Sequence, residues 1–331
     1  MKIAVLNPGG RDPEQAFTAF AGAPDDGVHA PVNFHAFAAC SGGSFQKRSS
    51  SIAADQKSVL LLLRPDLKGT FKVLEELKSR GKTVAVTWKE TGSHQIAQQL
   101  NGAANVEWFR KICAAAFGAI ATTPESLPLY RAAGAAKCEY IPTPYPTESA
   151  PWDFSIPVSS RRGVFIGTRE WDIPSRNHVA ALMTASTFRQ PVTVFNCDGR
   201  TGRRKLEALG IEHLEIIENR LPYSQYLRKL AQHRIVWQLD ASCVPGQVAG
   251  DAALCRVPCI GGNGAIDREV FPALAGHGRS IPDLMDAAAQ LLADSAAYEL
   301  AVESAASLAT QRIAFPVIHE QLTRFFSDPA R

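Results

Sequence analysis

The sequence predicts an α/β protein built from two doubly wound domains, and three observations support this fold class. Short apolar runs alternate with helical patterns, and this alternation starts again after residue 162. Continuous apolar runs such as residues 58–63, SVLLLL, are typical of parallel strands that are buried on both faces. The chain has 331 residues, which is enough for two domains of roughly 100–200 residues each.

The first half is expected to contain six strands separated by helices. The strands are predicted at residues 2–7, 32–37, 58–63, 83–88, 118–123 and 138–142. The helices are predicted at residues 67–80, about 105–116 and 124–134. The last of these begins with proline and ends with glycine, which is the usual asymmetry of helix ends.

A proline-rich segment at residues 142–162 separates the two halves. It holds five prolines, which neither a helix nor a central strand tolerates, and it is therefore predicted to be the linker between domains. The expected domains are residues 1–150 and residues 151–312. Residues 313–331 are expected to form a terminal helix, centred on 316–327, that returns to the first domain.

The second half repeats the same alternation. Strands are predicted at residues 163–168, 192–197, 213–217, 234–239 and 258–262. Helices are predicted near residues 176–188, 201–209, 222–232, 247–256, 281–294 and 297–310.

The composition is that of an ordinary globular protein. The net charge of +3, from 35 Lys and Arg against 32 Asp and Glu, is too small to indicate a nucleic acid or an anionic membrane as a partner. Seven cysteines without a CxxC pair indicate a reducing compartment and predict no zinc site. No signal peptide and no apolar run of about 18 residues is visible, so we expect a cytoplasmic protein without a transmembrane segment.

Two loops of the first half are candidates for ligand contact. Gly9, Gly10 and Arg11 lie in NPGGRDPEQAF, directly after the first strand, where glycines allow close approach of a ligand and a following helix would present its amides. The loop lacks the G-x-G-x-x-G spacing, so NAD is not expected. A plain turn between strand and helix is the alternative.

The second loop, TWKETGSHQ at residues 87–95, places Lys89, Glu90 and His94 after another strand. A carboxylate and an imidazole in one loop can share proton transfer or bind sugar hydroxyls. The alternative is a charged loop that is simply solvated.

In the second half, two further segments follow predicted strands. Arg169 and Arg176 in GTREWDIPSRNH are suited to clamp a diphosphate through bidentate hydrogen bonds. The residues from Asn219 to Tyr223 open the helix predicted at 222–232, where backbone groups can bind a nucleotide base. Packing of the tyrosine within the helix is the alternative.

The segment GQVAGDAALCRVPCIGGNG at residues 246–264 places a carboxylate at the start of an otherwise apolar helix. Asp251 is expected in the first turn, where it either accepts hydrogen bonds from a ribose diol or simply interacts with the helix dipole. The amides of Gly246, Gln247 and Val248 are expected to face phosphate.

Taken in their order along the chain, these segments resemble a GT-B glycosyltransferase, in which two Rossmann-like domains face one another across a cleft. The second half is similar to the nucleotide-sugar domain of the large retaining group. GDAALCRVPCIGG resembles that group's EA-x-A-x-G-x-P-V element, with Asp251 in place of the usual Glu. The first half resembles the group in AIATTPESLPLYRAAGAAKCEYIPTPYP.

The resemblance implies a role for each candidate. Asp251 would hold the ribose, Arg169 and Arg176 the diphosphate, and the residues near Asn219 to Tyr223 the base. His94 would lie near the transferred sugar, and Gly9 and Gly10 near the sugar or the acceptor. One position departs from the family, because its first Glu falls on Cys243, and a thiol cannot replace a carboxylate on sugar hydroxyls.

The resulting expectation is a glycosyltransferase that moves a hexose or pentose from a nucleotide-diphosphate donor, UDP- or GDP-linked, to an acceptor hydroxyl. Neither a metal nor a cofactor is expected, since the nucleotide sugar is a co-substrate and the sequence has no Asp-x-Asp motif. The acceptor is left open among glycan, lipid, protein and modified nucleic acid. The alternatives are a GT-B-like epimerase or phosphorylase, and a degenerate transferase that acts as a binding module.

Overall fold

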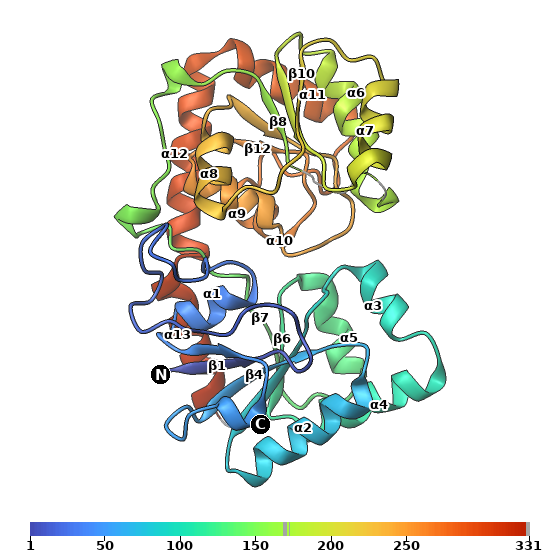
Figure 1. The fold of residues 1–331 in the computed structure, drawn as a ribbon, viewed down its shortest axis with the longest axis vertical. Helices are drawn as coiled ribbons and strands as arrows, with labels where there is room; N and C mark the ends of the chain where they lie inside the picture. The colour runs from blue at the N-terminus through green and yellow to red at the C-terminus, as the bar shows by residue number, and fades with distance from the viewer. Residues whose placement is uncertain (168–170, 172, 329–331) are drawn as a thin grey trace. The chain divides into compact units, whose positions relative to one another are not determined.

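The computed structural model describes residues 1–167, 171 and 173–328, and it separates the chain into two compact units (Figure 1). Unit 1 contains Met1–Ser149 together with the terminal segment that begins at Ile313, and unit 2 contains Ala150–Arg312. Each unit is built around its own parallel sheet. The expectation of two doubly wound α/β units is thereby confirmed.

Unit 1 contains a seven-stranded sheet with the strand order β2-β3-β1-β4-β5-β6-β7. All neighbouring pairs are parallel except β2 with β3. The strands are β1 (Ile3–Leu6), β2 (Gln15–Ala16), β3 (Ser44–Gln46), β4 (Ser58–Leu63), β5 (Thr83–Trp88), β6 (Gly118–Ala121) and β7 (Cys138–Tyr140). The helices are α1 (Phe34–Ala39), α2 (Leu67–Ser79), α3 (Ser93–Gln99), α4 (Ala103–Ala115), α5 (Leu127–Ala132) and α13 (Phe315–Ser327).

The core of unit 1 lies against the central strands. All six residues of β4 are buried, as expected for a strand covered on both faces. The Trp88 ring packs against Phe109 with centroids 5.0 Å apart, and the Trp88 backbone N–H donates to the Tyr130 hydroxyl at 2.8 Å. The end of β5 is therefore held in place by the helices around it.

The terminal helix α13 packs on unit 1. The Tyr145 N–H donates to the Ile313 carbonyl at 2.8 Å, just before the helix begins. Near its end, the Lys137 ammonium donates to the Phe325 carbonyl at 2.7 Å. These contacts explain why the last residues of the chain belong to the same unit as the first.

Unit 2 contains a five-stranded parallel sheet with the order β10-β9-β8-β11-β12. The strands are β8 (Val164–Ile166), β9 (Val192–Phe195), β10 (Leu214–Ile217), β11 (Ile235–Trp237) and β12 (Cys259–Ile260). The helices are α6 (His178–Ser186), α7 (Gly199–Ala208), α8 (Tyr223–Ala231), α9 (Gln247–Leu254), α10 (Ala265–Val270), α11 (Ile281–Ala293) and α12 (Ser295–Arg312).

A buried arginine joins the entry segment of unit 2 to its helices. The Arg161 guanidinium donates to the Tyr298 hydroxyl at 2.9 Å and to the Cys255 carbonyl at 3.1 Å. Tyr298 belongs to α12, and Cys255 ends α9. Because a buried charge is costly unless it is hydrogen-bonded, these contacts fix the long α12 against α9 and the start of the unit.

The strand predicted at residues 32–37 is wrong, since Phe34–Ala39 form helix α1. All six residues of α1 are buried, and a short apolar run that is buried on every side does not distinguish a strand from a helix by its periodicity. The strand next to β1 is instead β3, which is only three residues long.

The helix expected directly after the first loop is also absent from the described structure. After Gly10 the chain enters β2, which pairs antiparallel with β3, and the next helix begins only at Phe34. The first loop therefore offers no helix N-terminus to an anion.

Candidate functional site

The strand order of unit 2 marks one edge of its sheet as the place for a ligand. The chain runs from β8 to β9 and β10 on one side and then returns to β11 and β12 on the other. In open α/β sheets, ligands bind beyond the carboxyl ends of the strands at the point where the order reverses. That point lies between β8 and β11, so Gly167 and the residues from Gln238 onward lie there.

Helix α9 begins at this edge. A Cβ atom on Gly167 would lie 2.2 Å from Val248 Cγ1, so the end of β8 approaches the first turn of α9 too closely for any other residue. Gly246 precedes the helix with φ +88°, and no side chain of the described residues caps the helix start by a hydrogen bond. The first N–H groups of a helix have no partners within the helix. The predicted residues Gly246, Gln247 and Val248 therefore stand at the reversal point.

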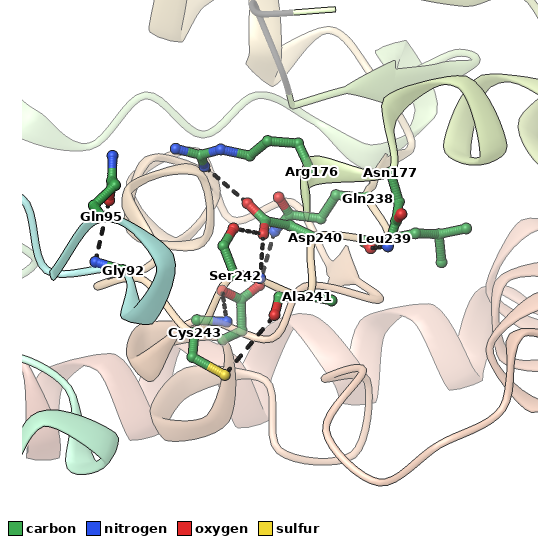
Figure 2. A network of polar contacts seen from close by, with 12 residues as sticks. Gly92, Gln95, Arg176, Asn177, Gln238, Leu239, Asp240, Ala241, Ser242 and Cys243 are labelled. Atoms are coloured by element: carbon green, nitrogen blue, oxygen red, sulfur yellow. Dashed lines mark hydrogen bonds and ion pairs between the residues drawn. The ribbon is translucent and has the colours of Figure 1, made fainter. Parts of the chain in front are cut away.

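Arg176 does not stand free to clamp a diphosphate, because it forms an ion pair with a carboxylate that the sequence did not reveal. Its Nη1 atom lies 2.8 Å from Oδ2 of the buried Asp240 (Figure 2). The Ser242 N–H donates to Asp240 Oδ1 at 2.7 Å, and the Ser242 hydroxyl also contacts that oxygen. Arg169, the other predicted arginine, lies outside the described residues.

A second buried carboxylate supports the turns on either side of α9. Asp267 accepts hydrogen bonds from Gln238 Nε2 at 2.8 Å and from the Gly264 N–H at 3.1 Å. A Cβ atom on Gly246 would lie 2.8 Å from Asp267 Oδ2, so the Asp267 side chain has room only because residue 246 is glycine. Burial, together with the negative charge of Asp240, raises the pKa of Asp267 to about 7.

Asp251 lies in the second turn of α9, not in the first turn as expected. It is the fifth residue of the helix and is 1% exposed. The helix dipole acts mainly within the first turn, so it explains this carboxylate less well than predicted. The Tyr223 hydroxyl donates to Asp251 Oδ1 at 2.5 Å, which brings together two residues that the sequence assigned separately to the donor.

Asn219, the other residue predicted near the base, lies exposed in the segment before α8. No hydrogen bond joins it to Tyr223 or Asp251 in the part of the chain that the structure describes. Tyr223 is the first residue of α8, and its ring stacks on Tyr226 with centroids 6.1 Å apart. Helix packing therefore accounts for part of its position.

Cys243 adopts the left-handed conformation, with φ +49°. Its sulfur lies 3.3 Å from Asn263 Nδ2, which donates to it. The residue is partly exposed and lies in the turn that leads from Asp240 to α9 (Figure 2). A thiol, and not a carboxylate, therefore occupies this turn.

Unit 1 reverses its strand order in the same way, between β1 and β4. Asn7 follows β1, and a Cβ atom on Gly10 would lie 2.1 Å from Asn7 Nδ2. Gly9 has φ +65° and open space around it, and Arg11 is exposed. The predicted glycine loop therefore folds over the Asn7 amide, which donates to Asp12 Oδ2 at 2.8 Å.

The residues predicted after β5 are only partly brought together. The Lys89 ammonium lies 3.6 Å from Asp12 Oδ2 and 3.8 Å from Glu90 Oε1. His94 is the second residue of α3, which begins after Gly92, whose N–H donates to Gln95 Oε1 at 3.1 Å (Figure 2). The His94 Nε2 atom lies 3.0 Å from Gln98 Nε2. Within the described residues, no hydrogen bond or ion pair joins His94 to Glu90.

The described residues lack both a metal-binding cluster and a membrane-spanning helix. They contain no group of three or more His, Cys, Asp or Glu side chains placed to hold a metal ion. None of their helices combines the length and the apolar character that crossing a membrane requires.

Comparisons with known proteins identify the fold. No protein-family model matches the sequence, and a search of curated proteins gives no match. Among solved structures, an α,α-trehalose 6-phosphate synthase from Burkholderia multivorans matches with a TM-score of 0.61 and 11% identity, over 98% of each chain. A UDP-forming α,α-trehalose-phosphate synthase from Burkholderia vietnamiensis matches with a TM-score of 0.58 and 12% identity, over 82% of this chain and 76% of that one.

A third structure shows the same likeness in a different enzyme. S. aureus TarM, in complex with fondaparinux, α-GlcNAc-glycerol and UDP, matches with a TM-score of 0.60 and 11% identity. The match covers 82% of this chain and 55% of that one. The two sheets described above and these matches show that the chain has the GT-B fold of these glycosyltransferases.

Proposed function

We propose that the protein is a glycosyltransferase that moves a sugar from a nucleotide-diphosphate donor to an acceptor hydroxyl. The observation that carries this proposal is the start of α9. This helix start, preceded by Gly246, stands at the strand-order reversal of unit 2, and the Tyr223–Asp251 pair lies one turn further along. Backbone N–H groups at a helix start suit a diphosphate, and a carboxylate suits a ribose diol.

In this proposal the donor lies along the carboxyl edge of unit 2. The diphosphate faces the amides of Gln247 and Val248, and Gly246 supplies the left-handed backbone turn, with φ +88°, that begins the helix there. Asp251 accepts hydrogen bonds from the ribose hydroxyls, and the Tyr223 hydroxyl keeps its carboxylate in place. The base lies toward Asn219 and the start of α8.

The proposed reaction exchanges one bond at the anomeric carbon for another. The bond to the diphosphate oxygen breaks, the acceptor oxygen bonds to the anomeric carbon, and the acceptor hydroxyl releases its proton. Negative charge develops on the departing diphosphate, where preorganised N–H groups and Arg169 stabilise it electrostatically. Arg176 contributes through its contact with Asp240, which fixes the turn before α9.

Unit 1 is proposed to hold the acceptor at its own carboxyl edge. Gly9 and Gly10 permit close approach of a sugar, and Arg11 and Lys89 supply positive charge nearby. Glu90, which is 54% exposed, and His94 on α3 are the proposed groups to receive the proton of the acceptor hydroxyl.

The finer features of the reaction are proposals of the same kind. The donor is a UDP- or GDP-linked hexose or pentose, and UDP is favoured because the fold is shared with a UDP-forming enzyme and with a complex that contains UDP. Catalysis is proposed to need no metal, because the N–H groups at the helix start and Arg169 would balance the charge of the diphosphate instead. Activity that is unchanged by a chelator supports this point, and loss of activity that Mg²⁺ or Mn²⁺ restores contradicts it.

Thermal unfolding with a panel of UDP-, GDP-, ADP-, CDP- and dTDP-sugars tests the donor. A ligand at about 100 times its dissociation constant adds about 2.7 kcal/mol of stability. We expect one nucleotide class to raise the unfolding midpoint of the wild type and of the control Asp286→Asn, which lies exposed on α11. Asp251→Asn should reduce the shift strongly. An equal shift in all three proteins would assign Asp251 a structural role.

Product analysis then separates transfer from the alternatives. Release of nucleoside diphosphate that depends on an acceptor supports a transferase, whereas a changed sugar on an intact nucleotide indicates an epimerase. Use of inorganic phosphate as the acceptor indicates a phosphorylase. Cys243 favours one further candidate, a degenerate transferase that binds the donor without turnover, because its thiol, held by Asn263, stands where the family resemblance of the sequence implies a carboxylate.

A further inference from the structure

Arg64 occupies a position in unit 1 that the strand order marks for a ligand. It directly follows β4, and Asn7 directly follows β1, the neighbouring strand. The strand order of unit 1 reverses between these two strands. The carboxyl ends of strands at such a reversal are where open α/β sheets bind ligands.

The guanidinium of Arg64 is anchored through Asn7. Its Nη1 atom donates to Asn7 Oδ1 at 3.4 Å. Asn7 is fully buried, and its Nδ2 atom donates to Asp12 Oδ2 at 2.8 Å. Gly10 lies so close to the Asn7 amide that a Cβ atom would be 2.1 Å away. The amide is therefore held on three sides, and it gives Arg64 a defined place at the edge.

The charge of Arg64 is not balanced within the described residues. Two carboxylates at this edge, Asp12 and Glu90, lie within 4 Å of the Lys89 ammonium. No Asp or Glu of the described chain forms an ion pair with the half-buried Arg64, whose only hydrogen bond there is the one to Asn7. Most of its fork of N–H donors is thus left for a partner from outside.

Lys89 adds a second positive charge to the same edge. Its backbone N–H donates to the Leu63 carbonyl at 3.1 Å, so it lies beside the residue that precedes Arg64. Its side chain is only 18% exposed, because it lies between Asp12, Glu90 and the Phe34 ring. An anion at Arg64 would therefore meet a second cation that its neighbours already hold in place.

We propose that Arg64, positioned by Asn7 and assisted by Lys89, binds an oxyanion, so that the acceptor carries a phosphate or a carboxylate group. The planar fork of arginine matches both groups through paired hydrogen bonds that are strengthened by opposite charge, and a neutral sugar has no such charge. The assignment of this anion to the acceptor rests on the proposed transferase function, whereas the anion site itself does not.

Titration with inorganic phosphate tests the site without any donor. Calorimetry is run at constant ionic strength, adjusted with chloride, on the wild type, on Arg64→Gln and on Arg110→Gln. Arg110 lies exposed on α4 and supplies a control with the same change of charge in the same unit. We expect the wild type and Arg110→Gln to bind phosphate alike, and Arg64→Gln to bind it about tenfold or more weakly.

The outcomes separate the two sources of the anion. Glucuronate is titrated in parallel, and binding of phosphate alone would assign a phosphorylated acceptor, whereas binding of glucuronate alone would assign an acidic sugar. Binding of both would support a general oxyanion site. Equal binding by the wild type and Arg64→Gln, or no binding of either anion to the wild type, would overturn the proposal.

A kinetic measurement links the site to the acceptor. Arg64→Gln should raise the KM for an anionic acceptor about tenfold or more and leave the KM for the nucleotide sugar unchanged. Arg64→Lys keeps the positive charge but loses the forked guanidinium. Its KM for the anionic acceptor should therefore lie between the values of the wild type and of Arg64→Gln. Equal acceptor KM values in the wild type and Arg64→Gln would contradict the assignment. Failure of every nucleotide sugar to bind would defeat the transferase proposal but not the phosphate result.

Discussion

In both sheets the strand order reverses at one point, and a carboxyl edge lies there. The side chains at these two edges differ in their chemistry. In unit 2 the charged groups are buried and paired, since Arg176 contacts Asp240 and Asp267 accepts hydrogen bonds from Gln238 and Gly264. In unit 1 Asp12 and Glu90 are 40% and 54% exposed, and Arg64 has no carboxylate partner among the described residues.

This difference indicates how each edge would contact a ligand. The carboxylates of unit 2 shape the turns around α9, and the donor contacts proposed there are mainly with backbone amides at the start of that helix. The edge of unit 1 offers side chains instead, above all Arg64 and Lys89. Backbone groups suit a ligand part that is always the same, such as a diphosphate, while side chains vary easily and suit a particular acceptor.

The largest effect should come from breaking the buried ion pair of unit 2. Asp240→Ala removes the partner of Arg176 and should lower the free energy of unfolding by about 3 kcal/mol, because an unpaired charge is left in a largely buried place. Asp12→Ala, at the exposed edge, should cost no more than about 1 kcal/mol. Urea unfolding followed by tryptophan fluorescence measures both, and equal losses would remove the contrast between the edges.

The next effect depends on pH. The pKa of Asp267 is raised to about 7, so the folded protein keeps a proton that the unfolded chain releases near its ordinary value of 3.8. Stability should therefore fall as pH rises from about 4 to about 7. Relative to Asp267→Asn, the wild type should lose on the order of 2 kcal/mol between pH 5 and pH 7.

The comparison with Asp267→Asn also cancels the effect of buried histidines. The pKa values of His178 and His233 are lowered by burial to about 3 and about 4, so their contribution is lost as pH falls below 6.5. The wild type and Asp267→Asn contain the same histidines, so the histidine contribution cancels when their stabilities are subtracted. A difference in stability that does not change with pH would show that Asp267 titrates normally.

Tyr223→Phe should give a smaller loss. It removes the hydroxyl that donates to the buried Asp251, at a cost of about 1.5 kcal/mol in urea unfolding. Because the carboxylate loses its fixed position, the donor-dependent shift of the unfolding midpoint should also decrease. Unchanged stability together with unchanged donor binding would separate this pair from the site.

The smallest effect is expected for Lys89→Gln in unit 1. Its ion pairs with Asp12 and Glu90 are long and reach exposed carboxylates, so the loss in free energy of unfolding should be about 0.5 kcal/mol. The loss should shrink further in high salt. A loss comparable to that of Asp240→Ala would show that the edge of unit 1 is also internally paired.

Most strands were predictable because their sequences are apolar throughout. SVLLLL and TVAVTW stand at β4 and β5 as expected, since buried parallel strands leave no polar face. The strand predicted at VNFHAF was wrong for the same reason, because a run that is apolar on all sides also fits the buried helix α1. The short strand β3, SFQ, has no such signal.

The site was predictable only where the chain marks it locally. Gly246 and the helix after it are visible in the sequence, and the predicted start near Gln247 is correct, although Asp251 lies in the second turn and not in the first. Asp240 gives no signal, because its partner Arg176 lies 64 residues earlier and they meet only in the folded sheet. Arg64, a lone charge between a buried strand and a proline, could have been noticed by its place at a strand end.

Hydrogen exchange with and without the nucleotide sugar that binds best would locate the donor on the fold. The donor should protect the amides of residues 246–250, at the start of α9, and of residues 238–243, which support it. The amides around Asn7 and Arg64 in unit 1 should gain protection only when an acceptor is also present. Donor protection confined to unit 1, or to the far ends of the unit 2 helices, would contradict the account.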